Sequence, residues 1–388
     1  MKVLVASPQP FYSERGTPIA VDHVVRALSE RGDNVDVLTY HLGEDVDYAN
    51  VRTHRIPPVP FIHDVPAGPS IRKLLCSMIL FVKALRMARG GGFDVVHAVE
   101  EAAIVAARMR ERSGIPFVYD MDSSMPLQTV ATYPFLRPLL GRLCQLEQRL
   151  VRRAAVVLAA SEPVSAVACR YRGDGIVTLP DISLIDGHAP APHGALNDLC
   201  AARGPLILYA GSLVKNRGIS LLLDSFAIAR NHGADAHLVI IGGTPTQIAG
   251  HQSHARRLGL APSVTFLGPR PVRDLGGYLA QAEILVSPQI EAMNTPMKIY
   301  SYLASAKPIL ATDLPAHRAV VDGASAMLAE PRPQAFAEAL SRLLSDPDLC
   351  RRLGEQGLRI AGNGHDYVHF RRKLWDVYGD LERGNGVC

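Results

Sequence analysis

The stretch SPQIEAMNTPMKIYSYLASAKPILAT, Ser287–Thr312, reads as the end of a strand, a loop, a helix and the next strand. Thr295 and Pro296 favour a helix start, because threonine is a good N-cap and proline fits the first helical position. The next buried strand is predicted over Pro308–Thr312. The loop then directs N–H groups and the positive helix end beyond the strand ends, where Lys298 adds a charge. A diphosphate suits this geometry; a plain strand–helix–strand connection is the equally weighted alternative.

Apolar strands alternate with amphipathic helices on both sides of this stretch. Alternation of this kind is typical of parallel sheets covered by helices on both faces, so the sequence predicts an α/β protein. The predicted strands are Lys2–Ala6, Val35–Tyr40, Asp94–Val99, Pro116–Met121, Val156–Ser161, Ile176–Leu179, Pro205–Ala210, His237–Ile241, Val264–Leu267, Ile284–Val286, Pro308–Thr312 and Ala326–Leu328.

The chain has 388 residues, which is long for one hydrophobic core and favours two domains. The alternation breaks at Asp186–Arg203, a stretch rich in Pro, Gly, Ala and His at its start, which we interpret as an interdomain linker. We expect one domain over residues 1–186 and another over 204–364. Residues 365–388 hold apolar side chains at helical spacing, and we expect this last helix to return to the first domain.

Composition excludes several classes of protein. The chain is 48% hydrophobic and 20% charged, and its net charge of +4 suits a phosphate-bearing substrate or an anionic surface rather than nucleic acid. Its six cysteines show no CxxC spacing, and we expect neither a signal peptide nor a membrane span. These features predict a reduced, cytoplasmic protein.

Glycine-containing loops follow three of the predicted strands, Lys2–Ala6, Pro205–Ala210 and His237–Ile241. Neither a GxGxxG nor a Walker loop is present, so an ordinary NAD or ATP site is not indicated. Each loop is either a ligand-binding loop or a tight turn, with equal support. The glycines after the strand His237–Ile241 approach either a ligand or a neighbouring helix. The candidate binding residues on these loops are Gly16, Thr17, Gly211, Ser212, Lys215, Arg217 and Gly243.

Acidic residues follow two further strands. Glu100 and Glu101 lie beyond a strand that contains His97, where open α/β sheets bind ligands. A satisfied core histidine is the favoured alternative for His97, and a helix start is the alternative for the glutamates. Asp120 and Asp122 form a DxD that either holds a divalent ion or, as we favour, makes turn hydrogen bonds; Asp122 facing a ligand without metal is a third option.

Two predicted helices are basic and amphipathic, over Ile71–Arg89 and Leu136–Arg153. Such helices usually pack one face and solvate the other, which is the favoured interpretation. Peripheral contact with a membrane is the alternative.

The chain resembles the retaining glycosyltransferases of GT-B fold, family 4. Similarity spans nearly the whole chain, in the family's order, and rests on the segments PFYSERGTPIAV, FDVVHAVEEAA, YDMDSSMP, YAGSLVKNRGISLLLDSF and SPQIEAMNTPMKIYSYLASAKPILAT. The resemblance implies two tandem Rossmann-like, doubly wound domains facing a central cleft. It also implies that a nucleotide-sugar donor binds mainly to the second domain and an acceptor mainly to the first.

The resemblance also assigns residues. It implies that Gly16 and Thr17 face the donor diphosphate or the acceptor. Ser212 and Arg217 match the family's phosphate-binding positions, with Ser212 replacing the usual arginine and Lys215 beside it. The turn from Asn294 to Lys298 would meet diphosphate and sugar.

Three positions depart from the family pattern. The family's paired glutamates fall at Met293 and Ser301, with Glu291 just outside that register. Ser301 stands where the family's glutamate binds ribose, and a subgroup with the NTPxKIYSYL form is close to this chain. Asp122 stands where many members carry a histidine beside the donor sugar.

The sequence therefore predicts a metal-independent, retaining transferase of the hexosyltransferase type. Its donor is a nucleotide-diphosphate sugar and its acceptor a small molecule, a glycan or a lipid-linked sugar. Asp122 and Glu291 are the candidate catalytic acids, while His97, Glu100 and Glu101 lie on the acceptor side. We expect no cofactor, no metal ligands, no nucleic acid and a cytoplasmic location, either free or peripheral to the inner face of the membrane. A GT-B sugar-nucleotide epimerase and a catalytically silent GT-B scaffold are the alternatives.

Overall fold

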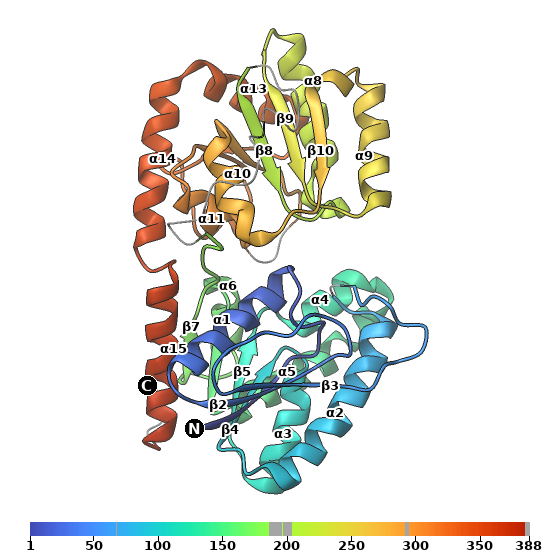
Figure 1. Ribbon diagram of the computed structural model, residues 1–388, viewed down its shortest axis with the longest axis vertical. Helices are drawn as coiled ribbons and strands as arrows, with labels where there is room; N and C mark the ends of the chain where they lie inside the picture. The colour runs from blue at the N-terminus through green and yellow to red at the C-terminus, as the bar shows by residue number, and fades with distance from the viewer. Residues whose placement is uncertain (67, 186–195, 197–203, 292–294, 385–388) are drawn as a thin grey trace. The chain divides into compact units, whose positions relative to one another are not determined.

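A computed structural model describes residues 1–66, 68–185, 196, 204–291 and 295–384. The chain forms two compact units, one of Met1–Asp181 with the segment from Tyr367 onward, the other of Ile182–Asp366 (Figure 1). Apart from Leu196, the proposed linker from Asp186 lies outside the described residues. Among the described helices, none combines the length and the apolar composition needed to cross a bilayer.

The first unit is a parallel sheet in the order β3-β2-β1-β4-β5-β6-β7. Its strands are β1 Lys2–Ala6, β2 Asn34–Thr39, β3 Val51–Arg55, β4 Val95–Val99, β5 Phe117–Met121, β6 Val156–Ala159 and β7 Ile176–Thr178. Its helices are α1 Gly16–Glu30, α2 Ile71–Gly91, α3 Ala102–Ser113, α4 Met125–Thr132, η1 Pro134–Leu139, α5 Leu140–Arg153, α6 Glu162–Cys169 and α15 Tyr367–Glu382.

The second unit is a parallel sheet in the order β10-β9-β8-β11-β12-β13. Its strands are β8 Leu206–Ala210, β9 His237–Ile241, β10 Val264–Gly268, β11 Ile284–Ser287, β12 Ile309–Thr312 and β13 Met327–Ala329. Its helices are η2 Lys215–Arg217, α8 Ile219–Asn231, α9 Pro245–Arg257, η3 Ala261–Ser263, η4 Val272–Asp274, α10 Leu275–Gln281, α11 Lys298–Ala304, α12 Pro315–Arg318, α13 Pro333–Ser345 and α14 Pro347–Gly362.

The two sheets confirm the predicted α/β class with its doubly wound parallel strands. Predicted and observed strands differ only at their ends, except that β3 was missed. Its sequence, Val-Arg-Thr-His-Arg, lacks an apolar run, which fits an edge strand whose residues are partly buried or, at Arg52, exposed.

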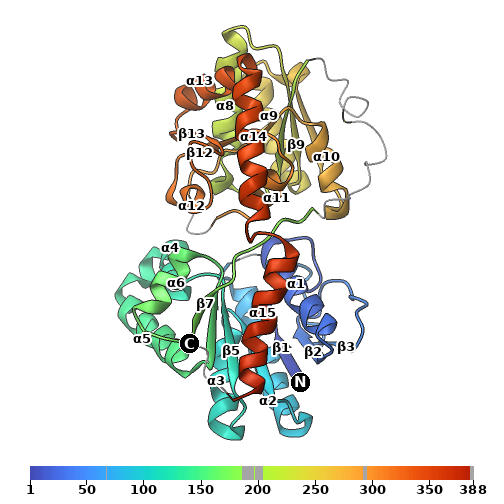
Figure 2. The ribbon, with the colours of Figure 1, turned by 90° about the vertical axis from the view of Figure 1, so that its left-hand side faces the viewer.

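The last helix, α15, belongs to the first unit and packs beside α1 (Figure 2). Phe370, Leu374 and Val377 are buried along one face of α15, at the predicted helical spacing. The Trp375 indole N–H donates to the Ala27 carbonyl oxygen at 2.7 Å, which fixes the end of α1 to this helix. The chain thus covers the first sheet with residues from both of its ends.

Each sheet has one point where the strand order reverses, between β1 and β4 in the first unit and between β8 and β11 in the second. Loops from adjacent strands diverge there at the carboxyl edge, which leaves a crevice where open α/β sheets bind ligands. The loop before Gly16 follows β1, and Glu100 follows β4. The loop from Gly211 follows β8, and the quoted stretch follows β11. Topology therefore places the predicted loops at both reversal points.

Candidate functional site

Lys298 forms the centre of the site in the second unit. Its Nζ lies 3.5 Å from the centroid of the Tyr209 ring, a cation–π contact. Gly211 lies against it with φ 146°, and a Cβ built there would come within 2.7 Å of that Nζ, so a larger residue would displace the lysine. Burial and then the positive charge of Arg217 hold the pKa of Lys298 well below its usual value.

Arg217 is positioned from the neighbouring loop by Gln289. The Arg217 Nη1 donates to Gln289 Oε1 at 2.8 Å, and the Gln289 side-chain N–H donates to the Glu291 carbonyl oxygen at 3.0 Å. The Thr312 hydroxyl donates to the Gln289 carbonyl oxygen. Sequence reasoning missed Gln289; its place directly after β11 at the reversal point was the available signal.

His317, also missed, is fully buried behind these two cations. Its Nδ1 donates to the Thr312 carbonyl oxygen at 2.6 Å, so Nε2 accepts from the Ser287 hydroxyl at 3.0 Å. Burial, with the charges of Lys298 and Arg217, lowers the pKa of His317 to about 4. The imidazole is therefore neutral near pH 7, and Arg217 and Lys298 carry the positive charge of this cluster.

The start of α11 differs from the prediction. Thr295 was expected to cap the helix, but α11 begins at Lys298, with Met297 as N-cap and no side-chain cap. The Thr295 hydroxyl instead donates to the Ala316 carbonyl oxygen at 2.7 Å. That partner, brought close by folding, competes with the cap and cannot be seen in the local sequence.

Other predicted donor-side residues occupy varied positions. Ser212, Lys215 and Glu291 are exposed. Ser301 is fully buried, and its Oγ accepts the Leu184 N–H at 2.9 Å. Asn294 lies outside the described residues.

Gly243 packs against a neighbouring loop, whereas the packing alternative predicted a neighbouring helix. Its φ is +85°, and a Cβ there would come within 2.4 Å of the Leu213 side chain. Gly243 therefore lets the loop after β9 lie against the loop after β8.

In the first unit, Thr17 and Asp122 meet at the carboxyl edge of the sheet. Arg15 is the N-cap of α1, and Thr17 lies in the first turn, where its hydroxyl hydrogen-bonds the Asp122 side chain. Gly16 is exposed, and a Cβ built on it meets no atom within 4 Å. The structure thus brings these three predicted residues together beside open space.

Asp122 belongs to an acidic edge of the first sheet. Burial, followed by the charges of Asp120, Glu100 and Asp181, raises the pKa of Asp122 well above its usual value. Burial and the charge of Asp120 raise the pKa of Asp181 to about 7. Sequence reasoning missed Asp181, although it follows β7 at the same edge. Within the described part of the chain, no group of three or more His, Cys, Asp and Glu side chains is arranged to hold a metal ion.

The predicted acceptor-side residues are held by structural contacts. His97 is fully buried, with Nδ1 at 2.9 Å from the Tyr378 hydroxyl and Nε2 at 3.2 Å from Asp120 Oδ2, which matches the favoured core-histidine alternative. Glu100 and Glu101 share the Lys73 ammonium, at 2.8 and 3.0 Å. Burial alone would lower the pKa of Lys73, but the two glutamates outweigh it and raise that pKa. All three are fixed within the first unit.

The chain matches two family models. Residues 15–182 match the model of Glycosyltransferase Family 4, and residues 204–346 match the model of Glycosyl transferases group 1. The α-D-kanosaminyltransferase of Streptomyces kanamyceticus is 25% identical over 290 residues, which is 72% of this chain and 74% of that protein.

Solved structures share the fold. The sucrose-phosphate synthase of Thermosynechococcus elongatus superposes with a TM-score of 0.82 at 19% identity, over 99% of this chain and 100% of that chain. HepE of Anabaena, solved in complex with UDP, superposes with a TM-score of 0.76 at 16% identity, over 98% and 100%. The predicted GT-B fold is confirmed by these similarities.

Replacing Asp181 by Asn should remove a pH-dependent destabilisation. The unfolded Asp181 loses its proton near its ordinary pKa of 3.8, whereas the folded one keeps it to about pH 7. Raising the pH across that window therefore weakens the parent. We expect Asp181→Asn to gain on the order of 2 kcal/mol of unfolding free energy over the parent between those pH values, measured by urea denaturation. Asp235→Asn, at an exposed carboxylate, is the matched control. An equal, pH-independent change of the unfolding free energy in both variants would contradict the raised pKa of Asp181.

Proposed function

The chain belongs to the family 4 glycosyltransferases of GT-B fold, and from that premise we propose that it transfers a sugar from a nucleoside-diphosphate donor with retention of configuration. The acceptor is a hydroxyl group of a small molecule, a glycan or a lipid-linked sugar. The α-D-kanosaminyltransferase and UDP-bound HepE support sugar transfer and a nucleotide donor, respectively.

The observation that carries this proposal is the pairing of Arg217 and Lys298 at the reversal point of the second sheet. Burial and the charge of Arg217 both lower the pKa of Lys298, and an anion close to both side chains would offset the repulsion between them. A diphosphate supplies that anion, and its leaving oxygen gains negative charge as the sugar–phosphate bond breaks. Fixed positive groups at that oxygen stabilise the transition state most.

In the proposed reaction, the bond from the anomeric carbon to the phosphate oxygen breaks and the acceptor oxygen bonds to the same face of that carbon. The acceptor's proton passes to the departing phosphate, so the products are the glycoside and a nucleoside diphosphate. Asp122 is the proposed catalytic acid beside the acceptor, since Thr17 orients its carboxyl group and burial among other carboxylates raises its pKa. Glu291, exposed after β11, is the second candidate.

Truncating either cation should weaken binding of the diphosphate. A charge-assisted contact to phosphate contributes roughly 1.5–3 kcal/mol, so Arg217→Ala and Lys298→Ala should each lose on the order of 10- to 100-fold in affinity. Calorimetry with UDP, GDP, ADP and TDP identifies the ligand and measures this loss. The corresponding nucleoside, which lacks phosphates, should bind parent and variants equally.

The control for this experiment is Arg273→Ala, which removes an exposed arginine of the same unit. Folded variants that bind the diphosphate like the parent would refute the cation pair. Donor consumption that needs no acceptor would favour the epimerase alternative, and binding without any turnover would favour the scaffold.

A chelator should leave turnover nearly unchanged, because Arg217, Lys298 and backbone N–H groups neutralise the diphosphate in the proposed reaction. The measurement is release of nucleoside diphosphate with and without EDTA. Loss of activity that manganese or magnesium restores would instead make Asp120 and Asp122 metal ligands.

A further inference from the structure

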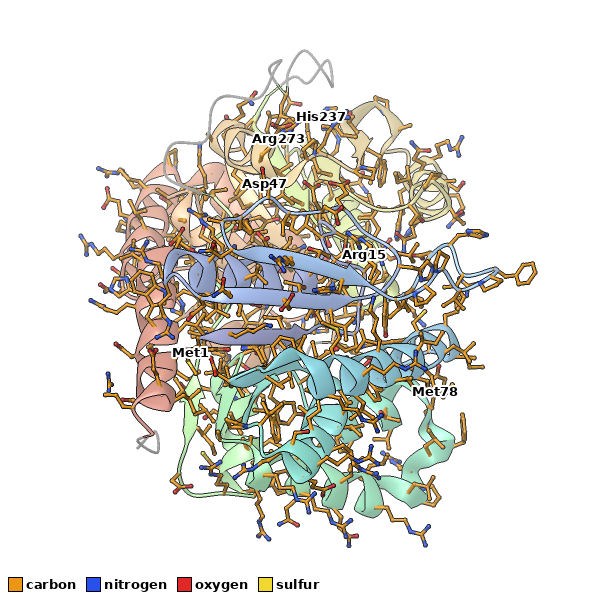
Figure 3. All side chains as sticks on the ribbon, turned by 60° about the horizontal axis from the view of Figure 1, so that its bottom comes forward. Met1, Arg15, Asp47, Met78, His237 and Arg273 are labelled. Atoms are coloured by element: carbon orange, nitrogen blue, oxygen red, sulfur yellow. The ribbon has the colours of Figure 1, made fainter. Side chains whose placement is uncertain are left out.

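Helix α2 exposes an apolar stripe to solvent. Ile71, Leu75, Met78 and Val82 recur at helical spacing, within an arc of about 60° on the helix. They are 77%, 41%, 50% and 50% exposed, while residues on the opposite face of α2, such as Leu80, are buried. Figure 3 labels Met78 on this helix at the surface of the first unit. An isolated exposed hydrophobic residue is ordinary, but an aligned series marks an interaction surface.

The apolar surface continues onto η1. Phe135 is 76% exposed, and Leu139 is exposed as well. The Tyr133 hydroxyl, at the start of η1, donates to the Pro69 carbonyl oxygen at 3.0 Å, directly before α2. That contact brings Phe135 to the end of α2 that carries Ile71.

A groove runs along the other side of the stripe. It has a volume of about 1030 Å³ and lies between α2 and the segment Ile56–Pro58 that follows β3. Met78 and Val82 line it, and Arg86 lies at the same wall. We name the α2 stripe, η1 and this groove together the α2 face.

The α2 face is strongly cationic. No aspartate or glutamate occurs from Val65 to Phe93 or from Ser123 to Leu146, although the whole chain has a net charge of only +4. Arg86 and Arg89 extend the stripe itself towards the end of α2. Further exposed arginines in these two segments are Arg72, Arg137 and Arg142.

We propose that the α2 face docks the protein on an anionic lipid bilayer. A helix that lies in the interface needs apolar side chains to enter the acyl boundary and basic side chains to meet anionic headgroups, and this face supplies both along one helix. The inference does not depend on the proposed transfer reaction. Docking through the α2 face would hold the protein at a lipid surface, where lipid-linked acceptors lie.

The charge pattern disfavours the other occupants. In a symmetric dimer the same patch meets itself, so a second copy would bring the arginines of both faces together. A nucleic acid would leave the apolar stripe against phosphates. Only an anionic surface with an apolar interior matches both features of the α2 face.

Flotation of the full chain with lipid vesicles tests this proposal. The parent should float with vesicles of equal parts phosphatidylcholine and phosphatidylglycerol, less so as salt rises, and weakly with phosphatidylcholine alone. Val82→Glu should lower the vesicle partition coefficient roughly 10-fold, since it removes apolar contact and adds a repelled charge. Arg86→Gln with Arg89→Gln should lower it on the order of 10-fold or more.

Matched controls lie elsewhere on the same chain. Val368→Glu changes a valine that is 58% exposed on α15, and Arg351→Gln with Arg352→Gln removes two exposed arginines of α14. Both should float like the parent, and unfolding midpoints should show all variants folded. Equal flotation of Val82→Glu and Val368→Glu would overturn the proposal. So would absence of vesicle binding together with a dimer, seen by gel filtration, that Val82→Glu abolishes.

Discussion

The second unit depends on holding two like charges close together. Arg217 and Lys298 repel each other, and no carboxylate in the described part of the chain pairs with either: the Tyr209 ring supports Lys298 and the neutral Gln289 amide supports Arg217. Gly211 leaves the lysine its space, and neutral His317 lies behind without adding charge. The fold thereby maintains an arrangement that favours an anionic ligand over the empty state, which is how functional sites commonly shift pKa values.

The first unit has the same strand topology as the second, but the side chains at the carboxyl edge of its sheet are acidic. The carboxyl edge of its sheet carries Asp122 directly after β5, where burial and the charges of Asp120, Glu100 and Asp181 raise the pKa of Asp122. Crowded, partly buried carboxylates keep protons that isolated ones would lose, and this suits hydrogen bonds to the hydroxyl groups of an acceptor. One connection pattern, repeated along the chain, thus builds a cationic edge in one unit and an acidic edge in the other.

Local sequence predicted the features that depend on local chemistry. Apolar runs located every strand except β3, whose charged residues fit an edge, and strand-end glycines located the loops at both reversal points. Features that depend on distant partners were missed or wrong. Thr295 hydrogen-bonds to Ala316, His317 hydrogen-bonds to Ser287, and burial with the charge of Asp120 raises the pKa of Asp181. Each of those effects arises only once folding joins separate segments.

The most direct test of the account is whether binding of a nucleoside diphosphate draws a proton onto Lys298. In the free protein, burial and the charge of Arg217 lower the pKa of Lys298, and a bound diphosphate should raise that pKa. Calorimetric titrations at a series of pH values, in buffers of different ionisation enthalpy, measure the protons exchanged. We predict net proton uptake that disappears in Lys298→Arg, whose guanidinium remains charged. No uptake at any pH, or uptake that persists in Lys298→Arg, would contradict the central claim.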